Sequence, residues 1–335
     1  MEWVREARRG EIQGFSDRKV YIVRSRSECV GKGIKPIGVR WVDSRKNDAV
    51  RSRLVAMDFN RNKGKKDDEM FAPTPSLLAS RWIVSRTASQ NWRGQGEMRL
   101  MAIDFTKAFL YGNMEREVYI ELPEEDQRKH EGDMVGFLLK AMYGLRDAPL
   151  IWQKVVREML EKRGFEALVS AQCVYVNKRT GVIVVAHVDD FLCQGDKREM
   201  EKFLEDLKKE YECGGVMLGP EEECSKEIKF LGRTIRWTQK VIEWEGDPKH
   251  VENYLTKIGL QQGKAVETPG IKHEDKEMVE PVAMSDKEAT EYRGLVALLN
   301  FMAQDRADLA FASKEASKSM SAPKKEDMVA LKRVG

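Results

Sequence analysis

Three aspartates stand where two short apolar runs end. Ile103 is followed by Asp104, and Val188 is followed by the adjacent pair Asp189 and Asp190. Each motif alone favours an ordinary turn, because Asp commonly ends strands and bonds to nearby backbone. The two motifs together favour a metal site. A carboxylate pair at the tip of an apolar hairpin repels itself and resists burial unless a divalent cation offsets the charge.

A carboxylate cluster of this kind suits magnesium chemistry. Mg²⁺ takes oxygen ligands and binds through one or two protein carboxylates, with substrate phosphates and water as its other ligands. Two such ions about 4 Å apart can activate a 3′-hydroxyl group and stabilise a leaving pyrophosphate in an in-line displacement. Nucleotide polymerisation needs such a site, with few protein ligands and one side open to the substrate.

The elements that must hold these acids alternate irregularly between strands and helices. The apolar run 100–103 predicts a strand before Asp104, and the runs 182–186 and 191–193 predict a hairpin around the Asp pair. Two further hairpins are expected at 37–57 and 228–244. Apolar spacing predicts helices at 77–92, 147–163, 197–211, 248–258, 292–302 and 307–320. Because regular βαβ alternation is missing, we expect the α+β class.

Local signals fix only some limits of these elements. Asp147 is expected to cap the helix 147–163, with Pro149 in its first turn. The segment 61–68 has the composition of a charged loop. The first 35 residues are polar and favour no particular element.

The composition limits the number of subdomains, the partners and the compartment. The 335 residues suit two or three coupled subdomains, with 41% hydrophobic residues for a core. The net charge of +3 is small, so a nucleic-acid partner would have to be held by local basic surfaces. Five cysteines without a Cys-x-x-Cys pair indicate a reduced intracellular compartment and no zinc site. We expect no membrane partner, because no apolar run is long enough to span a bilayer.

In these motifs the chain resembles a known family. Segments 102–112 and 185–192, which contain the three acids, are similar to the two metal motifs of the reverse transcriptases of copia-type retrotransposons. Further matches follow in the family's order between Gly38 and Met320, at 51–56, 117–123, 139–149, 230–232, 292–299 and 306–312, with Trp152 at the family's aromatic position. Several linked motifs in order are far more specific than an Asp pair alone.

The resemblance implies roles for residues at the metal site. Asp104 and Asp189 would bridge two Mg²⁺ ions, for which Mn²⁺ is a substitute, and Asp190 would complete the carboxylate cluster. The backbone carbonyl of Phe105 would add a further ligand. These four residues are the expected metal site, and the three acids are the expected catalytic residues.

The resemblance also implies a nucleotide site. Phe109 would lie under the sugar of the incoming nucleotide and exclude a 2′-hydroxyl group, and Arg51 and Arg53 would contact its triphosphate. Tyr143 and Gly144 would line the pocket. Without the family match, a structural interpretation is preferred for each of these residues. Phe109 would be a core aromatic, the arginines would lie on a solvated strand face, and the Tyr-Gly pair would form a turn.

The family's architecture is a right-hand polymerase fold. The resemblance implies an N-terminal extension at 1–35 and fingers, palm and thumb at 36–270, followed by a linker and helical connection at 271–335 that ends before any ribonuclease H domain. The fingers are expected at 36–95 and 113–145, the palm, an antiparallel sheet plus helices, at 96–112 and 146–245, and the thumb at 246–270. Lys249 and Lys257 are the expected nucleic-acid contacts of the thumb, through phosphates.

The implied partners are an RNA or DNA template with its primer and deoxynucleoside triphosphates (dNTPs). Protease, integrase and ribonuclease H are expected on a longer Pol polyprotein, and the expected location is a virus-like particle in the cytoplasm, with the nucleus as an alternative. The expected reaction is RNA-directed DNA synthesis.

Departures from the family's motifs leave two alternative functions open. His187 stands where the family has an aromatic residue, Thr106 and Lys107 are in reversed order, and Met57 and Asp58 replace Lys-Gly. One alternative is therefore an inactive reverse transcriptase-like remnant that binds nucleic acid or protein. Another is a metal-dependent phosphoryl-transfer enzyme of a different palm type.

Overall fold

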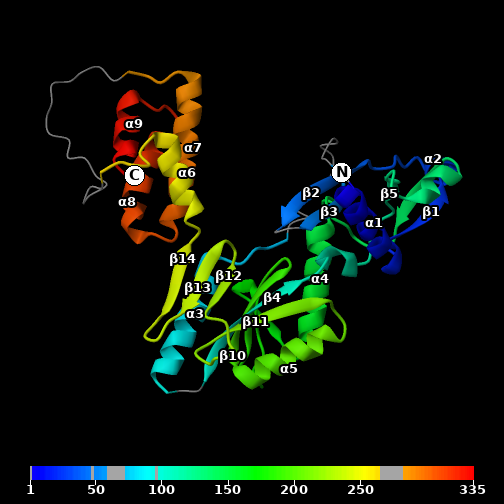
Figure 1. Ribbon diagram of the computed structural model, residues 1–335, viewed down its shortest axis with the longest axis horizontal. Coiled ribbons are helices and arrows are strands. Elements are labelled where there is room, and N and C mark those ends of the chain that lie inside the picture. The colour runs from blue at the N-terminus through cyan, green and yellow to red at the C-terminus, as the bar shows by residue number, and fades with distance from the viewer. Residues whose placement is uncertain (1, 47–48, 59–71, 95–96, 265–281) are drawn as a thin grey trace. The chain divides into compact units, whose positions relative to one another are not determined.

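The structure is a computed structural model that describes residues 2–46, 49–58, 72–94, 97–264 and 282–335 (Figure 1). Its contacts divide the chain into two compact units, 1–226 and 227–335. Each unit has its own hydrophobic core. Among the described residues, no helix is both long and apolar enough to cross a bilayer.

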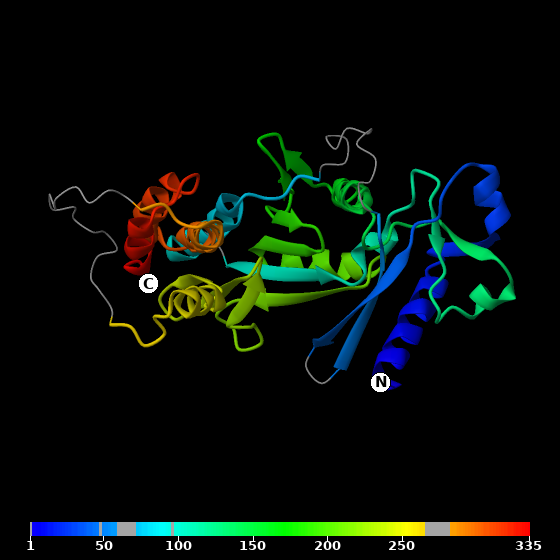
Figure 2. The ribbon, with the colours of Figure 1, turned by 90° about the horizontal axis from the view of Figure 1, so that it is seen from above.

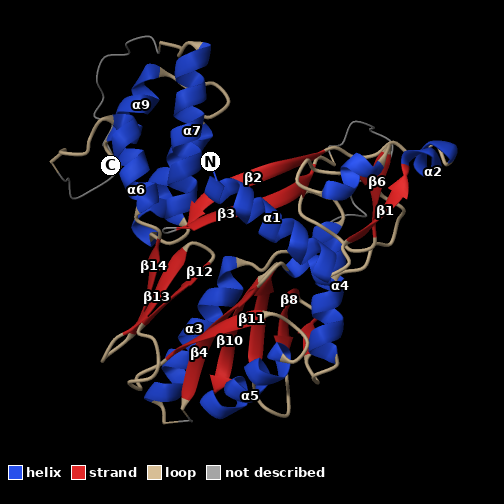
Figure 3. Ribbon diagram, turned by 45° about the vertical axis from the view of Figure 1, so that its right-hand side comes forward, coloured by secondary structure: helices blue, strands red, loops and turns tan. Residues whose placement is uncertain are grey.

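The centre of the first unit is a six-stranded antiparallel sheet in the order β11-β4-β10-β9-β8-β7 (Figure 3). Its strands are β4 (Met98–Phe105), β7 (Glu166–Leu168), β8 (Ala171–Val176), β9 (Ile183–His187), β10 (Asp190–Asp196) and β11 (Cys213–Leu218). One face packs against α4 (Ala148–Glu161) and α5 (Lys197–Lys208), and α3 (Leu77–Trp92) contacts β4, β9 and β10. Side chains alternate along each strand, so one face builds the main core while the other can carry the polar site.

The rest of the first unit surrounds a second core. A three-stranded sheet has the order β1 (Tyr21–Ser25), β6 (Met134–Leu138), β5 (Tyr119–Glu121), and a separate two-stranded ribbon pairs β2 (Val39–Lys46) with β3 (Ala49–Ala56). The helices are α1 (Glu2–Asp17) and α2 (Arg26–Gly31), with 3₁₀ turns at Ala108–Tyr111 and Gln127–Glu131. The helix α1 lies beside the β2–β3 ribbon (Figure 2). Phe15, Val20 and Leu54 meet in the shared core, so the first 35 residues contribute to the packing of this unit.

The second unit joins a small sheet to a helical group. Its sheet is β12 (Glu227–Phe230), β13 (Arg233–Trp237) and β14 (Ile242–Gly246). Its helices are α6 (Lys249–Ile258), α7 (Asp286–Ala303), α8 (Ala310–Lys318) and α9 (Lys325–Lys332). Tyr254, Tyr292 and Leu331 are buried among these helices.

Several expectations are confirmed, and two are wrong in detail. The helix 77–92 and the ribbon at 37–57 are present, and the α+β class holds. The predicted hairpin at 228–244 is instead three strands. Leu231 (φ 49°) and Gly232 (φ 71°) form a tight two-residue turn of the type that joins antiparallel strands. The expected loop at 61–68 lies outside the described residues, and the limits of fingers, palm and thumb stay predictions.

Asp147 does not cap α4, although it directly precedes the helix. No hydrogen bond joins its carboxylate to the helix N–H groups. That carboxylate instead accepts a hydrogen bond from Arg116 Nε at 2.6 Å, and Arg116 Nη2 also donates to Asp58 at 2.7 Å. Asp58 further accepts from the backbone N–H of Arg146. The unusual acid at position 58 therefore belongs to an ion-pair network that ties the end of the ribbon to the start of α4.

Candidate functional site

Two of the three candidate acids lie directly opposite each other on adjacent strands. Asp104 of β4 pairs in register with Asp190 of β10. Opposite residues of an antiparallel pair share a face and have Cβ atoms about 4.5–5.5 Å apart. Ile103 and Phe105 are buried while Asp104 is exposed, because alternate residues of β4 point to opposite faces. The structure therefore brings together acids that are far apart in the chain.

The third acid lies in a strained turn. His187 pairs with Asp190, which leaves Val188 and Asp189 as a two-residue turn between β9 and β10. Val188 has a φ of 50°, whereas the φ of Asp189 is not positive, as in a type II′ turn. A β-branched residue in the left-handed region is a genuine outlier, and such strain clusters at functional sites. The strained Val188 marks this turn as a candidate part of a functional site.

Two hydrogen bonds hold that turn in place. The buried indole of Trp152, on α4, donates from Nε1 to the carbonyl oxygen of Val188 at 2.6 Å. The backbone N–H of Phe105 donates to the carbonyl oxygen of Asp189 at 3.1 Å. The Phe105 ring packs against Trp152 with centroids 5.6 Å apart. The turn is thus fixed both to α4 and to β4.

The electrostatics of the acids are those of crowded like charges. Burial, followed by the charges of Asp189 and Asp104, raises the pKa of Asp190 above its usual range, while His187 acts in the opposite direction. A divalent cation favours the ionised form of such a carboxylate. No group of three Asp, Glu, His or Cys side chains is close enough to form a complete metal cage within the described part of the chain. Mg²⁺ does not require one, since phosphates and water supply most of its ligands.

A cleft of about 450 Å³ adjoins Asp104. This volume lies within the range of small-molecule sites. Its walls come from the end of β4, the ribbon strand β3, Tyr143 and helix α1, and its lining residues are Ala7, Gly10, Glu11, Val50, Arg51, Ser52, Arg53, Asp104, Thr106, Lys107 and Tyr143. Cations and acids both line it, and the predicted nucleotide residues Arg51, Arg53 and Tyr143 are among them.

Arg53 has an unmet bonding requirement inside this cleft. Arg51 and Arg53 share one face of β3, because Ser52 and Leu54 between and after them are buried. The guanidinium carbon of Arg53 lies 5.6 Å from the centre of the Tyr143 ring. Its Nε is buried and has no hydrogen-bond partner among the described residues. A buried donor without a partner is costly, so an acceptor-rich ligand suits this position.

Tyr143 connects the arginines to the other candidate residues. The ring of Phe109 meets the Tyr143 ring edge to face, with centroids 5.2 Å apart. Burial raises the pKa of Tyr143, with Arg53 opposing and Asp189 adding to the shift. Gly144 has a φ of 87°. Phe109 and Arg53 therefore both contact Tyr143, which lines the cleft together with Asp104.

Other expected contacts lie elsewhere. Lys249 and Lys257 are exposed on α6 of the second unit, and their contact with nucleic acid stays a prediction. Two residues at the cleft were not found from the sequence, namely Glu11 of α1 and its partner Lys107. Glu11 lies in a segment that favoured no element, and no motif marks it.

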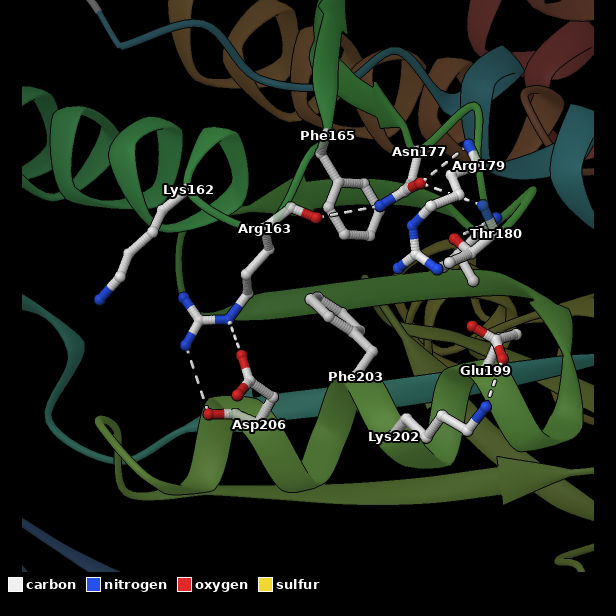
Figure 4. A pocket seen from close by; sticks show the side chains of 11 residues that line it. Lys162, Arg163, Phe165, Asn177, Arg179, Thr180, Glu199, Lys202, Phe203 and Asp206 are labelled. Carbon is white, nitrogen blue, oxygen red and sulfur yellow. Dashed lines mark hydrogen bonds and ion pairs between the residues drawn. The ribbon is translucent and has the colours of Figure 1, made fainter.

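A second hollow has a structural explanation. It lies between the end of α4, the β8–β9 turn and α5, next to Val182 at the far end of β9 from His187 (Figure 4). Asn177 accepts hydrogen bonds from the backbone N–H groups of the turn. Ion pairs join Arg163 to Asp206 at 2.7 Å and Lys202 to Glu199 at 2.6 Å. These four charges are paired within the fold, which explains their presence at the hollow.

Comparison with known proteins agrees with the geometry. The model of the family "Reverse transcriptase (RNA-dependent DNA polymerase)" matches residues 26–272, so the chain belongs to this family. The family's right-hand polymerase architecture is therefore that of this chain. The assignment of the six-stranded antiparallel sheet to the palm stays a prediction.

Similar polyproteins place the chain more closely within this family. It is 29% identical over 320 residues to the retrovirus-related Pol polyprotein from transposon TNT 1-94 of Nicotiana tabacum, covering 90% of this chain and 23% of that protein. It is 27% identical over 312 residues to the Pol polyprotein from transposon RE1 of Arabidopsis thaliana, covering 89% and 20%. The resemblance to copia-type reverse transcriptases is confirmed, and the chain spans less than a quarter of these relatives. A foamy viral protease-reverse transcriptase in complex with double-stranded DNA matches with a TM-score of 0.45 and 12% identity, over 97% of this chain and 48% of that one.

Proposed function

We propose that this chain is the polymerase core of an RNA-directed DNA polymerase, which adds dNTPs to the 3′ end of a primer on an RNA template and then on DNA. The observation that carries the proposal is the register pairing of Asp104 with Asp190 beside the strained turn that holds Asp189. A cleft with two arginines opens next to Asp104, as a triphosphate substrate requires.

Two Mg²⁺ ions fit the donors present. Asp104 and Asp189 would hold them, with Asp190 completing the carboxylate cluster and the Phe105 carbonyl adding a backbone ligand. The raised pKa of Asp190 supports this assignment, because crowded carboxylates are stabilised in their ionised form by a cation. When bound, the ions activate the primer hydroxyl group and neutralise charge on the transferred phosphate. Mn²⁺ has the same preference for oxygen ligands and would substitute.

The remaining residues bind and orient the nucleotide. Arg51 and Arg53 would bind the triphosphate, and the unpartnered Nε of Arg53 supports this role. Phe109, packed edge to face on Tyr143, would lie under the sugar. Gly144 keeps the pocket wall close to β3. The template-primer would be held through phosphates, with Lys249 and Lys257 among the contacts.

The biological setting is also part of the proposal. The relatives are Pol polyproteins, so protease, integrase and ribonuclease H domains would accompany this core on a longer chain. Reverse transcription would take place in a cytoplasmic virus-like particle, with the nucleus as the alternative.

A primer-extension assay on an RNA template, with and without Mg²⁺, tests the proposal. We expect magnesium-dependent extension that Asp104→Asn and Asp189→Asn each abolish. Asp133→Asn is the matched control, because Asp133 is an exposed acid paired with Arg26 outside the cleft. Extension that survives in both variants would disprove the mechanism. Tight template-primer binding without incorporation, in a protein shown to be folded by circular dichroism, would favour the inactive remnant.

A further inference from the structure

Helix α1 forms one wall of the cleft beside Asp104. Ala7, Gly10 and Glu11 of this helix line it. Residues three and four apart lie on one helical face, so α1 presents a continuous strip to the cleft. Arg8 fixes the helix to the ribbon and to the neighbouring loop, through Asp43 at 2.7 Å and Glu125 at 2.9 Å.

Glu11 is a buried acid on that wall. Only 6% of its surface is exposed, although Glu is rarely buried unless it is paired. Its partner is Lys107, whose Nζ lies 2.6 Å from Glu11 Oε2. Gly14 makes room for the ammonium group, because a Cβ atom there would lie 2.6 Å from Lys107 Nζ. The helix is therefore shaped to hold this lysine.

Lys107 is itself in an unusual conformation. It directly precedes the 3₁₀ turn that carries Phe109, and its φ is 54°, in the left-handed region. Non-glycine residues adopt that region at a cost, and they persist there when their surroundings hold them. In this conformation Lys107 pairs with Glu11, and it is the only lysine among the described residues that line the cleft.

The charges of the cleft then set up a competition. Arg51, Arg53 and Lys107 attract a polyphosphate, whereas Glu11 repels it in a partly desolvated site. A lysine ammonium binds phosphate as a point charge and can exchange one anionic partner for another. We propose that Lys107 binds the triphosphate of the incoming nucleotide, and that Glu11 competes with the phosphates for its ammonium group. This inference rests on the proposed nucleotide site.

Nucleotide binding and turnover on matched variants test the competition. The dissociation constant of a fluorescent dTTP analogue with Mg²⁺, and the dNTP KM and kcat in primer extension, would be measured for the wild type, Lys107→Met, Lys107→Arg, Glu11→Gln and the double variant E11Q/K107M. Lys154→Met is the control, because Lys154 forms an equally short ion pair with Glu115 (2.6 Å) and does not line the cleft.

Lys107→Met is expected to weaken nucleotide binding and raise KM by about tenfold or more, the loss of one charged hydrogen bond, with a smaller change in kcat. Lys107→Arg keeps the charge and is expected to stay close to the wild type. Glu11→Gln is expected to tighten binding by about fivefold, since a repulsive charge is removed. In the double variant most of that gain is lost, because it acts through Lys107. The control is expected to change neither constant.

Other outcomes overturn the inference. Unchanged nucleotide affinity in Lys107→Met excludes a phosphate contact, and weaker binding in Glu11→Gln makes Glu11 a positioning residue instead of a competitor. Should Lys107→Met fail to fold, Lys107→Arg and Glu11→Gln still decide between these results. Nucleotide binding without extension by the wild type would count against the proposed polymerase alone, whereas absence of nucleotide binding would remove this inference.

Discussion

Gly144 packs directly on the backbone of Ala56. A Cβ atom at Gly144 would lie 2.0 Å from the Ala56 carbonyl oxygen, and the Ala56 N–H donates to the Tyr143 carbonyl oxygen at 2.8 Å. This contact fixes the strand that carries Arg51 and Arg53 to the segment that carries Tyr143. The position of both arginines therefore depends on the absence of a side chain at Gly144.

Gly144→Ala is expected to destabilise the protein by about 3 kcal/mol or more, because a left-handed conformation and a backbone overlap are combined. It should also raise the KM for dNTP, as β3 is displaced. Gly181→Ala is the matched control, since Gly181 has a φ of 72° and no atom near its Cβ position, and about 1 kcal/mol is expected there. Urea unfolding measures both. Equal losses in the two variants would show that the Ala56 contact is unimportant.

Trp152→Phe removes the hydrogen bond that supports the Val188 carbonyl oxygen. We expect a loss of about 1–3 kcal/mol in stability, the penalty for an unsatisfied buried acceptor. The kcat of primer extension should fall more than the KM for dNTP changes, because the turn holds Asp189. Trp92→Phe, at a site that is 88% exposed, is the control and should change neither quantity. A normal kcat in Trp152→Phe would separate the indole from the placement of the acids.

Phe109→Ala is expected to raise the incorporation of ribonucleotides relative to deoxyribonucleotides. The ring would no longer fill the space under the sugar, and the gain should be about tenfold or more, the lower end of what one steric contact contributes to discrimination. Phe109→Tyr keeps the ring that packs on Tyr143 and should retain the selectivity. Competition between dGTP and GTP in primer extension gives the ratio. Unchanged sugar selectivity in Phe109→Ala would exclude Phe109 as the gate.

The pH dependence of stability should reveal the Arg99–Glu221 ion pair. Hydrogen bonds from Arg99, including one from Nε at 2.8 Å, lower the pKa of Glu221 from 4.5 to about 2. A lowered carboxyl pKa adds stability above the unfolded-state value, and this is lost as pH falls through the folded-state value. We expect a loss of about 2 kcal/mol between pH 4.5 and pH 2, after allowance for partial exposure.

Urea unfolding across this pH range measures that loss. Glu221→Gln should not show this loss of stability at low pH. Glu222→Gln, a substitution at an exposed neighbour, should behave like the wild type. The same pH profile in Glu221→Gln and the wild type would assign the acid sensitivity to other groups.

Local signals predicted helices and strands best where side-chain chemistry acts over short distances. The helix 77–92 has the expected limits, because the Ser76 hydroxyl accepts the Ala79 N–H at its start, and its buried positions 80, 83, 84 and 87 recur at helical spacing. Asp147 shows the opposite case. Its sequence position favours a cap, but the distant Arg116 bonds its carboxylate, and no local rule foresees that partner.

The sequence predicted that the three acids form one site, but it did not predict which of them lie opposite each other. Strand ends and family motifs placed Asp104 near the Asp pair, but the register of β4 against β10 joins segments that are remote in sequence. The helix α1 was missed for a different reason. Its buried positions are Glu11, Gly14 and Phe15, so a charge and a glycine occupy the inner face, and the segment as a whole is polar.

The packing of the N-terminal segment limits how far this chain can be truncated. The match to the family model begins at residue 26, after α1 and β1. Phe15 and Val20 are nevertheless 1% and 0% exposed. A protein shortened to the matched region would lose one edge strand of the β1-β6-β5 sheet and bare an apolar surface prone to self-association. The match to the family model and the packed core of the first unit therefore have different boundaries in this molecule.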